Sequence, residues 1–237
     1  MASSKIDVDA TIGKAKEVAL SAYARAEEEG LFSHFGDFNE DLITPVKGIM
    51  TDQNLAAAPT YKDKALYLLD QAKTELVKTF SLQEQLFLQP GSSQQIVEEC
   101  KARYILYNTV GFWLGVLEAV ITGLFGNGWL SILFNGVLAY MIAYLCFWCI
   151  CCAAKPKYMF WALAFICLYT AFCLGMGWAF FFPLILPGIL YYAKGFCCVL
   201  LGINGYFIYR EAYTGDSFVP PGAAPCLEAG GGGASMM

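Results

Sequence analysis

One nearly charge-free stretch constrains this chain more than any other feature. Between residues 104 and 209 the only charged side chains are Glu118, Lys155, Lys157 and Lys194. A helix needs about 20 consecutive apolar residues to cross the hydrocarbon core of a bilayer, and this stretch is long enough for four such helices. The sequence therefore predicts an all-α protein built around a four-helix transmembrane bundle.

The four predicted spans follow one another closely. They cover residues 104–125, 129–152, 158–182 and 184–209. The spacers between them are so short that consecutive spans must run antiparallel, and a bend is expected around Pro183 and Pro187. The chain is 57% hydrophobic, with a mean hydropathy of +0.50, which is too apolar for an ordinary soluble domain of this size. Continuous apolar runs, rather than alternating ones, argue against a β-barrel.

The remainder of the chain divides around this block. Residues 1–91 read as a helical region outside the membrane, and residues 92–209 as a helical stalk leading into the four spans. Residues 210–237 are rich in glycine and proline and are expected to form a short disordered tail.

Two helices are predicted in the first region, over residues 6–29 and 61–88, because apolar residues recur there at helical spacing. Thr60 is placed to cap the second helix. Residues 30–60 contain three glycines and two prolines and are expected to form a loop.

The distribution of charged residues indicates both the class of partner and the orientation of the spans in the membrane. Residues 1–103 carry 11 basic and 16 acidic side chains, and such an acidic region argues against a nucleic-acid partner. The basic residues beside the spans are Lys101, Arg103, Lys155, Lys157 and Arg210. All of them fall on one side of an antiparallel bundle, so the positive-inside rule predicts that both termini are cytosolic.

Two charges lie inside predicted spans, Glu118 in the first and Lys194 in the fourth. Because these spans run in opposite directions, the two side chains are expected at matching depth and therefore as an ion pair, with Asn135 of the second span as a hydrogen-bond partner. An ionisable group within a membrane span is a functional candidate by default. Two interpretations remain open: a relay for protons or ions, or a buried pair that sets the register of the helices.

Small residues recur every four positions on the first span, at Gly111, Gly115, Ala119 and Gly123. Such a ridge lets another helix approach closely. It predicts either packing inside the bundle or a seam between copies in a homo-oligomer.

Three cysteines, Cys149, Cys151 and Cys152, precede the basic residues Lys155 and Lys157 at the end of the second span. Cysteines beside a membrane surface are candidates for S-palmitoylation, and otherwise serve as small packing residues. The two lysines are candidates for contact with acidic lipid head groups.

Sequence motifs of catalysis are not found. The chain has no nucleophile elbow, phosphate-binding loop or zinc-protease motif. It is expected to be non-enzymatic, with no catalytic residues, cofactor or metal.

Three short segments resemble the secretory carrier membrane proteins. They are Gly-Trp-Leu-Ser-Ile-Leu at 128–133, Lys-Pro-Lys-Tyr at 155–158 and Tyr-Thr-Gly-Asp-Ser-Phe at 213–218. The resemblance implies a four-span protein of vesicle or post-Golgi membranes, with a middle loop that acts on membrane lipids and fusion machinery.

Two functions are compatible with these patterns. The first is a non-enzymatic protein of Golgi, endosomal or vesicle membranes. It would organise the bilayer, trafficking proteins or a second copy of itself through its N-terminal helices and basic middle loop. The alternative is a small transporter or channel subunit that uses the Glu118–Lys194 pair.

Overall fold

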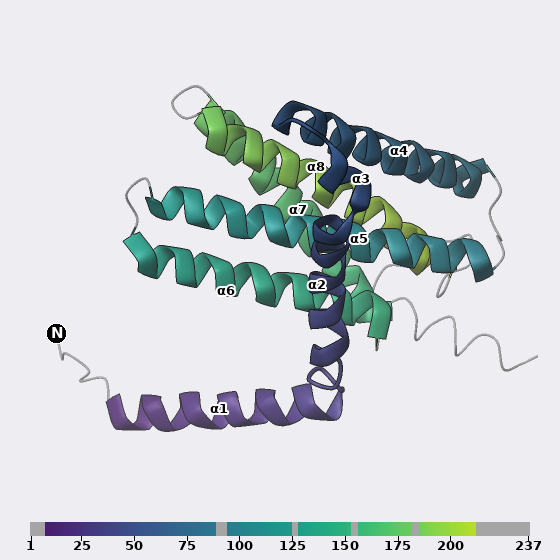
Figure 1. The fold of residues 1–237 in the computed structure, drawn as a ribbon. Helices are drawn as coiled ribbons and strands as arrows, with labels where there is room; N and C mark the ends of the chain where they lie inside the picture. Colours follow the sequence, from purple (N-terminus) through teal and green to yellow (C-terminus); the bar gives the residue numbers. More distant parts are fainter. Residues whose placement is uncertain (1–7, 89–93, 125–127, 153–155, 182–184, 212–237) are drawn as a thin grey trace, which may run out of the picture.

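The computed structural model describes residues 8–88, 94–124, 128–152, 156–181 and 185–211, and the regular elements in these ranges are all helices (Figure 1). The predicted all-α class is therefore confirmed. The predicted C-terminal tail beyond residue 211, Pro183 and the segment 213–218 lie outside the described residues. Arg210 and Glu211, the first two residues of that predicted tail, are helical.

Four of these helices are long and apolar enough to cross a membrane. They are α5 (Gln94–Thr122), α6 (Gly128–Phe147), α7 (Pro156–Phe181) and α8 (Ile185–Tyr209). The stretches that meet the length and hydropathy of a span are Val97–Thr122, Gly128–Cys151, Tyr158–Phe181 and Ile185–Tyr209. These agree with the four predicted spans, and α5 also includes residues 94–103 of the predicted stalk without a break.

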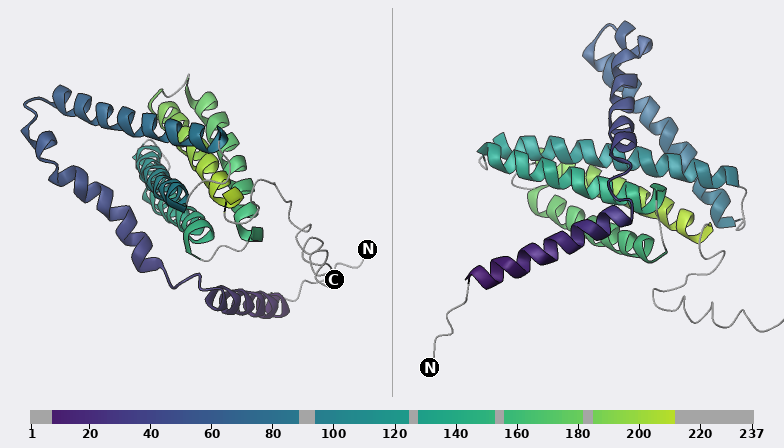
Figure 2. Two further views of the ribbon diagram at one scale, coloured as in Figure 1. Left: turned by 90° about the vertical axis from the view of Figure 1, so that its right-hand side faces the viewer. Right: turned by 90° about the horizontal axis from the view of Figure 1, so that it is seen from below.

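The four helices form a bundle in which α8 is the central member. It packs along both α5 and α7, and α5 packs in turn on α6 (Figures 1 and 2). Of the most apolar part of each helix, 56% is buried inside the protein for α8, against 33% for α5, 24% for α6 and 22% for α7. The outer faces of α6 and α7 are therefore available to lipid.

The start of α8 approaches α7 very closely. A Cβ atom placed on Gly188 would lie 2.7 Å from the Cα of Phe181, so only glycine fits here. Pro187 lies in the first turn of α8, where proline is tolerated because the amide of that turn has no helical partner. The bend predicted at Pro187 is therefore wrong.

The N-terminal region contains α1 (Val8–Glu28), α2 (Phe35–Thr51), α3 (Gln53–Ala57) and α4 (Tyr61–Leu88). Helices α1 and α4 match the two predicted helices. The loop predicted for residues 30–60 is wrong, because α2 and α3 occupy most of it. Burial of Phe38 and Leu42 stabilises α2, although Pro45 lies inside the helix, and such tertiary packing commonly overrides local propensity.

Helix α2 crosses the spans instead of running along them (Figure 1). The ring of Phe38 packs against Tyr144 and Phe147 of α6, with ring centroids 5.2 and 5.3 Å apart. The indole Nε1 of Trp113 donates a hydrogen bond of 3.1 Å to the carbonyl of Leu42. The N-terminal region is thus attached directly to the bundle.

Helix α4 docks on the bundle through its second half. Leu82 and Leu86 are buried in a cluster with residues of α5 and α8, and the Thr79 hydroxyl lies 2.7 Å from that of Tyr107. Leu69 and Phe80, two of the apolar residues that recur at helical spacing on α4, are exposed. The side of the helix that faces the spans is the one that carries Thr79, Leu82 and Leu86. We refer to α2, α3 and α4 together as the arm; α2 and α4 diverge from the bundle and meet at α3 (Figure 2).

Acid is expected to weaken the attachment of the arm. Glu75 of α4 accepts hydrogen bonds from Lys78, 2.8 Å away, and from Arg103 of α5, 3.0 Å away. Both contacts hold the pKa of the Glu75 carboxyl below its ordinary value of 4.5. The stabilisation, up to about 1 kcal/mol for a partly exposed pair, is therefore fully present above that value and is lost as the pH falls through the lowered pKa.

Thermal unfolding of wild type and Glu75→Gln over a pH series measures this contribution. The difference in unfolding temperature is expected to be present at neutral pH and to vanish in acid, while Glu84→Gln on the same helix has little effect at any pH. A difference that stayed constant across the series would contradict a role for the ionised carboxyl.

Candidate functional site

Glu118 of α5 and Lys194 of α8 meet inside the bundle. The Lys194 Nζ lies 2.9 Å from Oε2 of Glu118, and the side chains of the two residues are only 8% and 12% exposed. The second oxygen, Oε1, accepts a hydrogen bond of 2.8 Å from the Tyr191 hydroxyl. The structure thus brings together the two intramembrane charges that the sequence singled out, and adds a phenol.

Aromatic rings complete the surroundings of the ammonium group. The Lys194 Nζ lies 5.2 Å from the ring centroid of Tyr169 on α7 and 5.5 Å from that of Tyr191, distances at which a cation is attracted to a ring face. Gly115 of α5 faces the same amine, since a Cβ there would lie 3.9 Å from Nζ. A larger residue at this position would take up space beside the charge.

A cavity of about 180 Å³ lies next to the pair, and we call it the charged cavity. Its polar lining residues are Glu118, Asn135, Tyr169, Tyr191 and Lys194, so all four spans contribute to it. Asn135 therefore lies at the level predicted for it. One water occupies about 30 Å³ in the liquid, so the charged cavity has room for several waters beside the ion pair.

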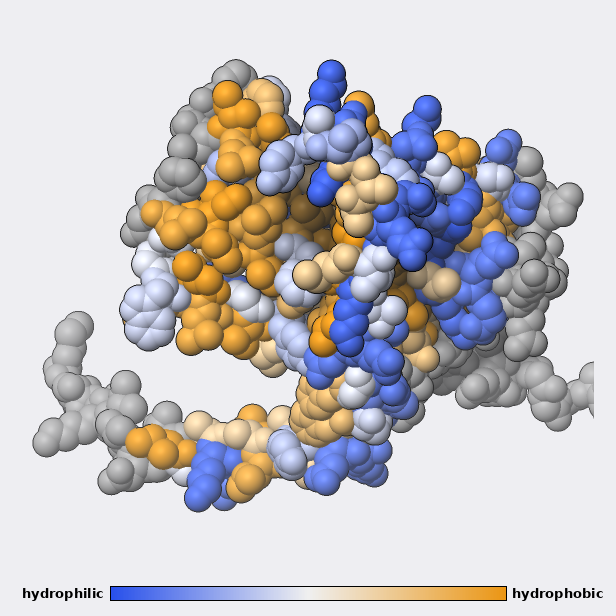
Figure 3. All heavy atoms as spheres, in the orientation of Figure 1, coloured by the Kyte–Doolittle hydropathy of each residue, from blue (hydrophilic) through white to orange (hydrophobic). Residues whose placement is uncertain are grey.

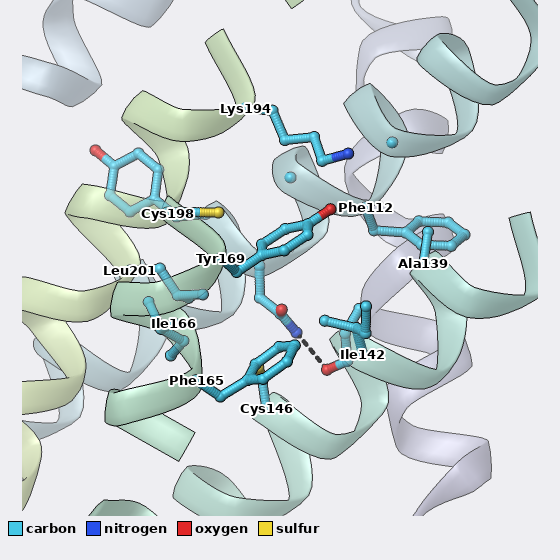
Figure 4. A pocket seen from close by; sticks show the side chains of 15 residues that line it. Phe112, Ala139, Ile142, Cys146, Phe165, Ile166, Tyr169, Lys194, Cys198 and Leu201 are labelled. Carbon is cyan, nitrogen blue, oxygen red and sulfur yellow. Dashed lines mark hydrogen bonds between the residues drawn. The ribbon is translucent and has the colours of Figure 1, made fainter. Parts of the chain in front are cut away.

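A second, narrower cavity of about 40 Å³ adjoins the first. The two share Tyr169 and Lys194 among their lining residues, and the narrow cavity extends from there toward Asn108 and Cys146 (Figure 4). The amide of Asn108 donates a hydrogen bond of 2.9 Å to the carbonyl of Ala143. Space thus continues along the bundle from the charge pair through mostly apolar surroundings, with room at its narrow part for about one water.

The predicted small-residue ridge lies largely inside the bundle. A Cβ on Gly115 would contact Ala139 at 3.4 Å, and one on Gly123 would lie 2.1 Å from the side chain of Ile132. Ala119 is buried, and Gly111 lines the narrow cavity. The ridge therefore brings α6 close to α5 and leaves space beside Lys194.

The cysteine cluster falls on a π-helical turn, η2 (Trp148–Cys152), at the end of α6. Cys149 and Cys151 are half-buried and pack against the core of the bundle. Lys155 lies outside the described residues, as do the side chains of Cys152 and Lys157. The two visible thiols of this cluster are thus in contact with protein.

Tyr191 and Tyr169 were not predicted from the sequence to belong to this site. Tyr191 lies three residues before Lys194 on one helix, and residues at this spacing share a face, so a signal for it existed. Tyr169 comes from a different span, and no local pattern marks it.

No protein family, curated protein or solved structure matches the chain. Within the ranges that the structure describes, no group of three or more His, Cys, Asp or Glu side chains is placed to hold a metal ion. The geometry of the charged cavity is therefore the basis for inferring function.

Proposed function

We propose that this protein is a small, non-enzymatic membrane transporter or channel subunit, in which the Glu118–Lys194 pair lies on the path of a proton or small ion. The observation that carries this proposal is the charged cavity. A pair that only joined two helices would need no space beside it, whereas here Glu118 and Lys194 border room for several waters. Intramembrane ionisable residues beside such a cavity are typical of solute pathways.

Orientation in this proposal follows from charge. The end of the bundle that carries Arg103 and Arg210 would face the cytosol, since positive residues favour that side. Solute would then pass between the charged cavity and the narrow cavity near Asn108.

Purified protein in liposomes that contain a pH-sensitive dye is expected to pass protons faster than empty liposomes, and Glu118→Gln is expected to abolish the difference. This substitution removes the anionic group that borders the charged cavity. The matched control is the double variant Glu118→Gln/Lys194→Met, which removes both charges and so leaves no unpaired charge in the bundle.

Transport by the double variant distinguishes a role of the Glu118–Lys194 pair in conduction from a purely structural role. A stable double variant without flux supports the pathway, whereas flux that survives in it contradicts the proposal. Absence of flux in wild type for protons and for Na⁺ and K⁺ would also contradict it.

The second candidate is membrane organisation at vesicle or post-Golgi membranes. The observation that favours it is exposed apolar side chains on helices outside the spans, among them Val18 and Leu20 of α1 and Leu69 and Phe80 of α4, which a partner protein would cover. A tagged protein found on a mitochondrial or plastid inner membrane would contradict this candidate.

A further inference from the structure

A large cavity lies between the arm and the spans, away from the charge pair. It measures about 530 Å³ and we call it the arm cavity. Its apolar lining includes Leu106, Val110, Phe196 and Leu200 from α5 and α8, with Leu68 and Ala72 from α4. Figure 3 shows an apolar hollow beside the junction of α2 and α3, while hydrophilic residues cover much of the rest of the arm.

The chemistry of this cavity favours a hydrocarbon occupant. Its volume falls within the ~300–1,000 Å³ typical of small-molecule sites, and water does not fill apolar cavities readily. One wall belongs to two membrane spans, on which Val110 and Phe196 are 38% and 45% exposed. These side chains continue the lipid-facing surface of the bundle into the cavity, so a lipid chain can enter from the bilayer without crossing water.

The polar residues at the rim of the arm cavity determine which polar end group a bound hydrocarbon chain could carry. Asp52 and Glu75 line the arm cavity together with Tyr67 and Gln71, and no Lys or Arg belongs to its lining, all of which lies in the described ranges. The Tyr67 hydroxyl donates a hydrogen bond of 2.9 Å to Oδ2 of Asp52. Hydrogen bonds from the Leu55 amide and from Tyr67 hold the pKa of Asp52 below its ordinary range, so this carboxylate is charged at neutral pH.

Glu75 is already paired with Lys78 and Arg103. Asp52 has no cation among the lining residues, so its carboxylate repels a phosphate or a carboxylate and attracts a hydrogen-bond donor. We propose that the arm cavity binds one single-chain lipid from the bilayer, whose polar end is a hydroxyl or an amine. The hydrocarbon chain lies against α5 and α8, and the end group reaches the Asp52 rim. The arm and the spans thereby share a ligand that holds them together. This inference does not depend on ion transport.

Binding of radiolabelled monooleoylglycerol and oleylamine to the delipidated full chain in detergent tests the site. We expect about one bound molecule per chain. Ala72→Trp from the arm wall and Val110→Trp from the span wall are each expected to weaken binding at least about tenfold, because the indole occupies the cavity. The controls are Ala65→Trp on α4 and Leu117→Trp on α5, which add the same group outside the lining.

Selectivity supplies a test that needs no bulky substitution. Oleate is expected to bind at least about tenfold more weakly than oleylamine, and Asp52→Asn is expected to remove this preference. Asparagine caps a helix as well as aspartate does, so α3 should remain folded, which circular dichroism checks.

Three results would overturn the proposal. They are equal binding by Ala72→Trp and Ala65→Trp, oleate binding as tightly as the amine and the glyceride, and retention of two-chain phospholipid in place of single-chain lipid.

Discussion

Replacing Lys194 with methionine is expected to lower the free energy of unfolding by about 3–5 kcal/mol, the usual cost of removing one member of a buried ion pair. The change removes the ammonium partner of the Glu118 carboxylate inside the bundle, although the Tyr191 hydroxyl still donates to it. Unfolding in detergent, followed by circular dichroism against temperature and denaturant, measures the loss.

The double variant Glu118→Gln/Lys194→Met is expected to recover most of this stability, because neither charge is then left without its partner. Residues in direct contact give non-additive effects, whereas independent sites add. Losses in Glu118→Gln and Lys194→Met that simply summed in the double variant would show that the 2.9 Å contact contributes nothing.

Gly188→Ala is expected to destabilise the protein by about 1–3 kcal/mol, the typical cost of overfilling a packed interior. The new Cβ would lie 2.7 Å from the Cα and 2.9 Å from the amide nitrogen of Phe181. Backbone atoms cannot rotate away as a side chain can, so the ends of α7 and α8 must separate. The same unfolding experiment reports the change.

Gly175→Ala on α7 is the matched control, since nothing lies within 4 Å of a Cβ at that position. Alanine favours a helix over glycine by up to about 1 kcal/mol, so this variant is expected to be neutral or slightly stabilising. If Gly188→Ala behaved like Gly175→Ala, the close approach of the two helices at Phe181 would not contribute to stability.

The spans and the pairing of Glu118 with Lys194 could be predicted because both follow from the length of the apolar runs, the length of the spacers and the position of each residue along its helix. An uninterrupted apolar run requires a membrane helix, and short spacers require antiparallel neighbours. The depth of a residue then follows from its distance along the helix. Helix α4 was also predicted, including the cap at Thr60, whose hydroxyl accepts a 3.2 Å hydrogen bond from the Asp63 amide.

Features that depend on packing between distant segments could not be predicted. Helix α2 contains Pro45 and two glycines, and its stability comes from Phe38 and Leu42 resting on α6. Which side of α4 is buried depends on its contacts with the spans, namely the packing of Leu82 and Leu86 and the hydrogen bond between Thr79 and Tyr107. The place of Tyr169 in the charged cavity depends on how α7 is rotated about its axis, which the nearly uniform apolarity of that helix does not specify.

The crossing of α2 over the spans has a consequence for the membrane itself. Its contacts fall on Trp113 and Tyr140, near the middle of their spans, yet α2 carries exposed Asp37 and Glu40. A hydrocarbon layer that covered these spans from end to end would surround those charges, at a high cost. The docked arm and a thick bilayer therefore compete for the same surface of α5 and α6.

Where α2 lies on α5 and α6, the surface of these two spans is covered by protein and not by lipid. A hydrocarbon layer of about 30 Å would otherwise enclose the exposed carboxylates of Asp37 and Glu40. The lipids that surround the bundle must therefore be displaced or thinned on the side where α2 crosses it.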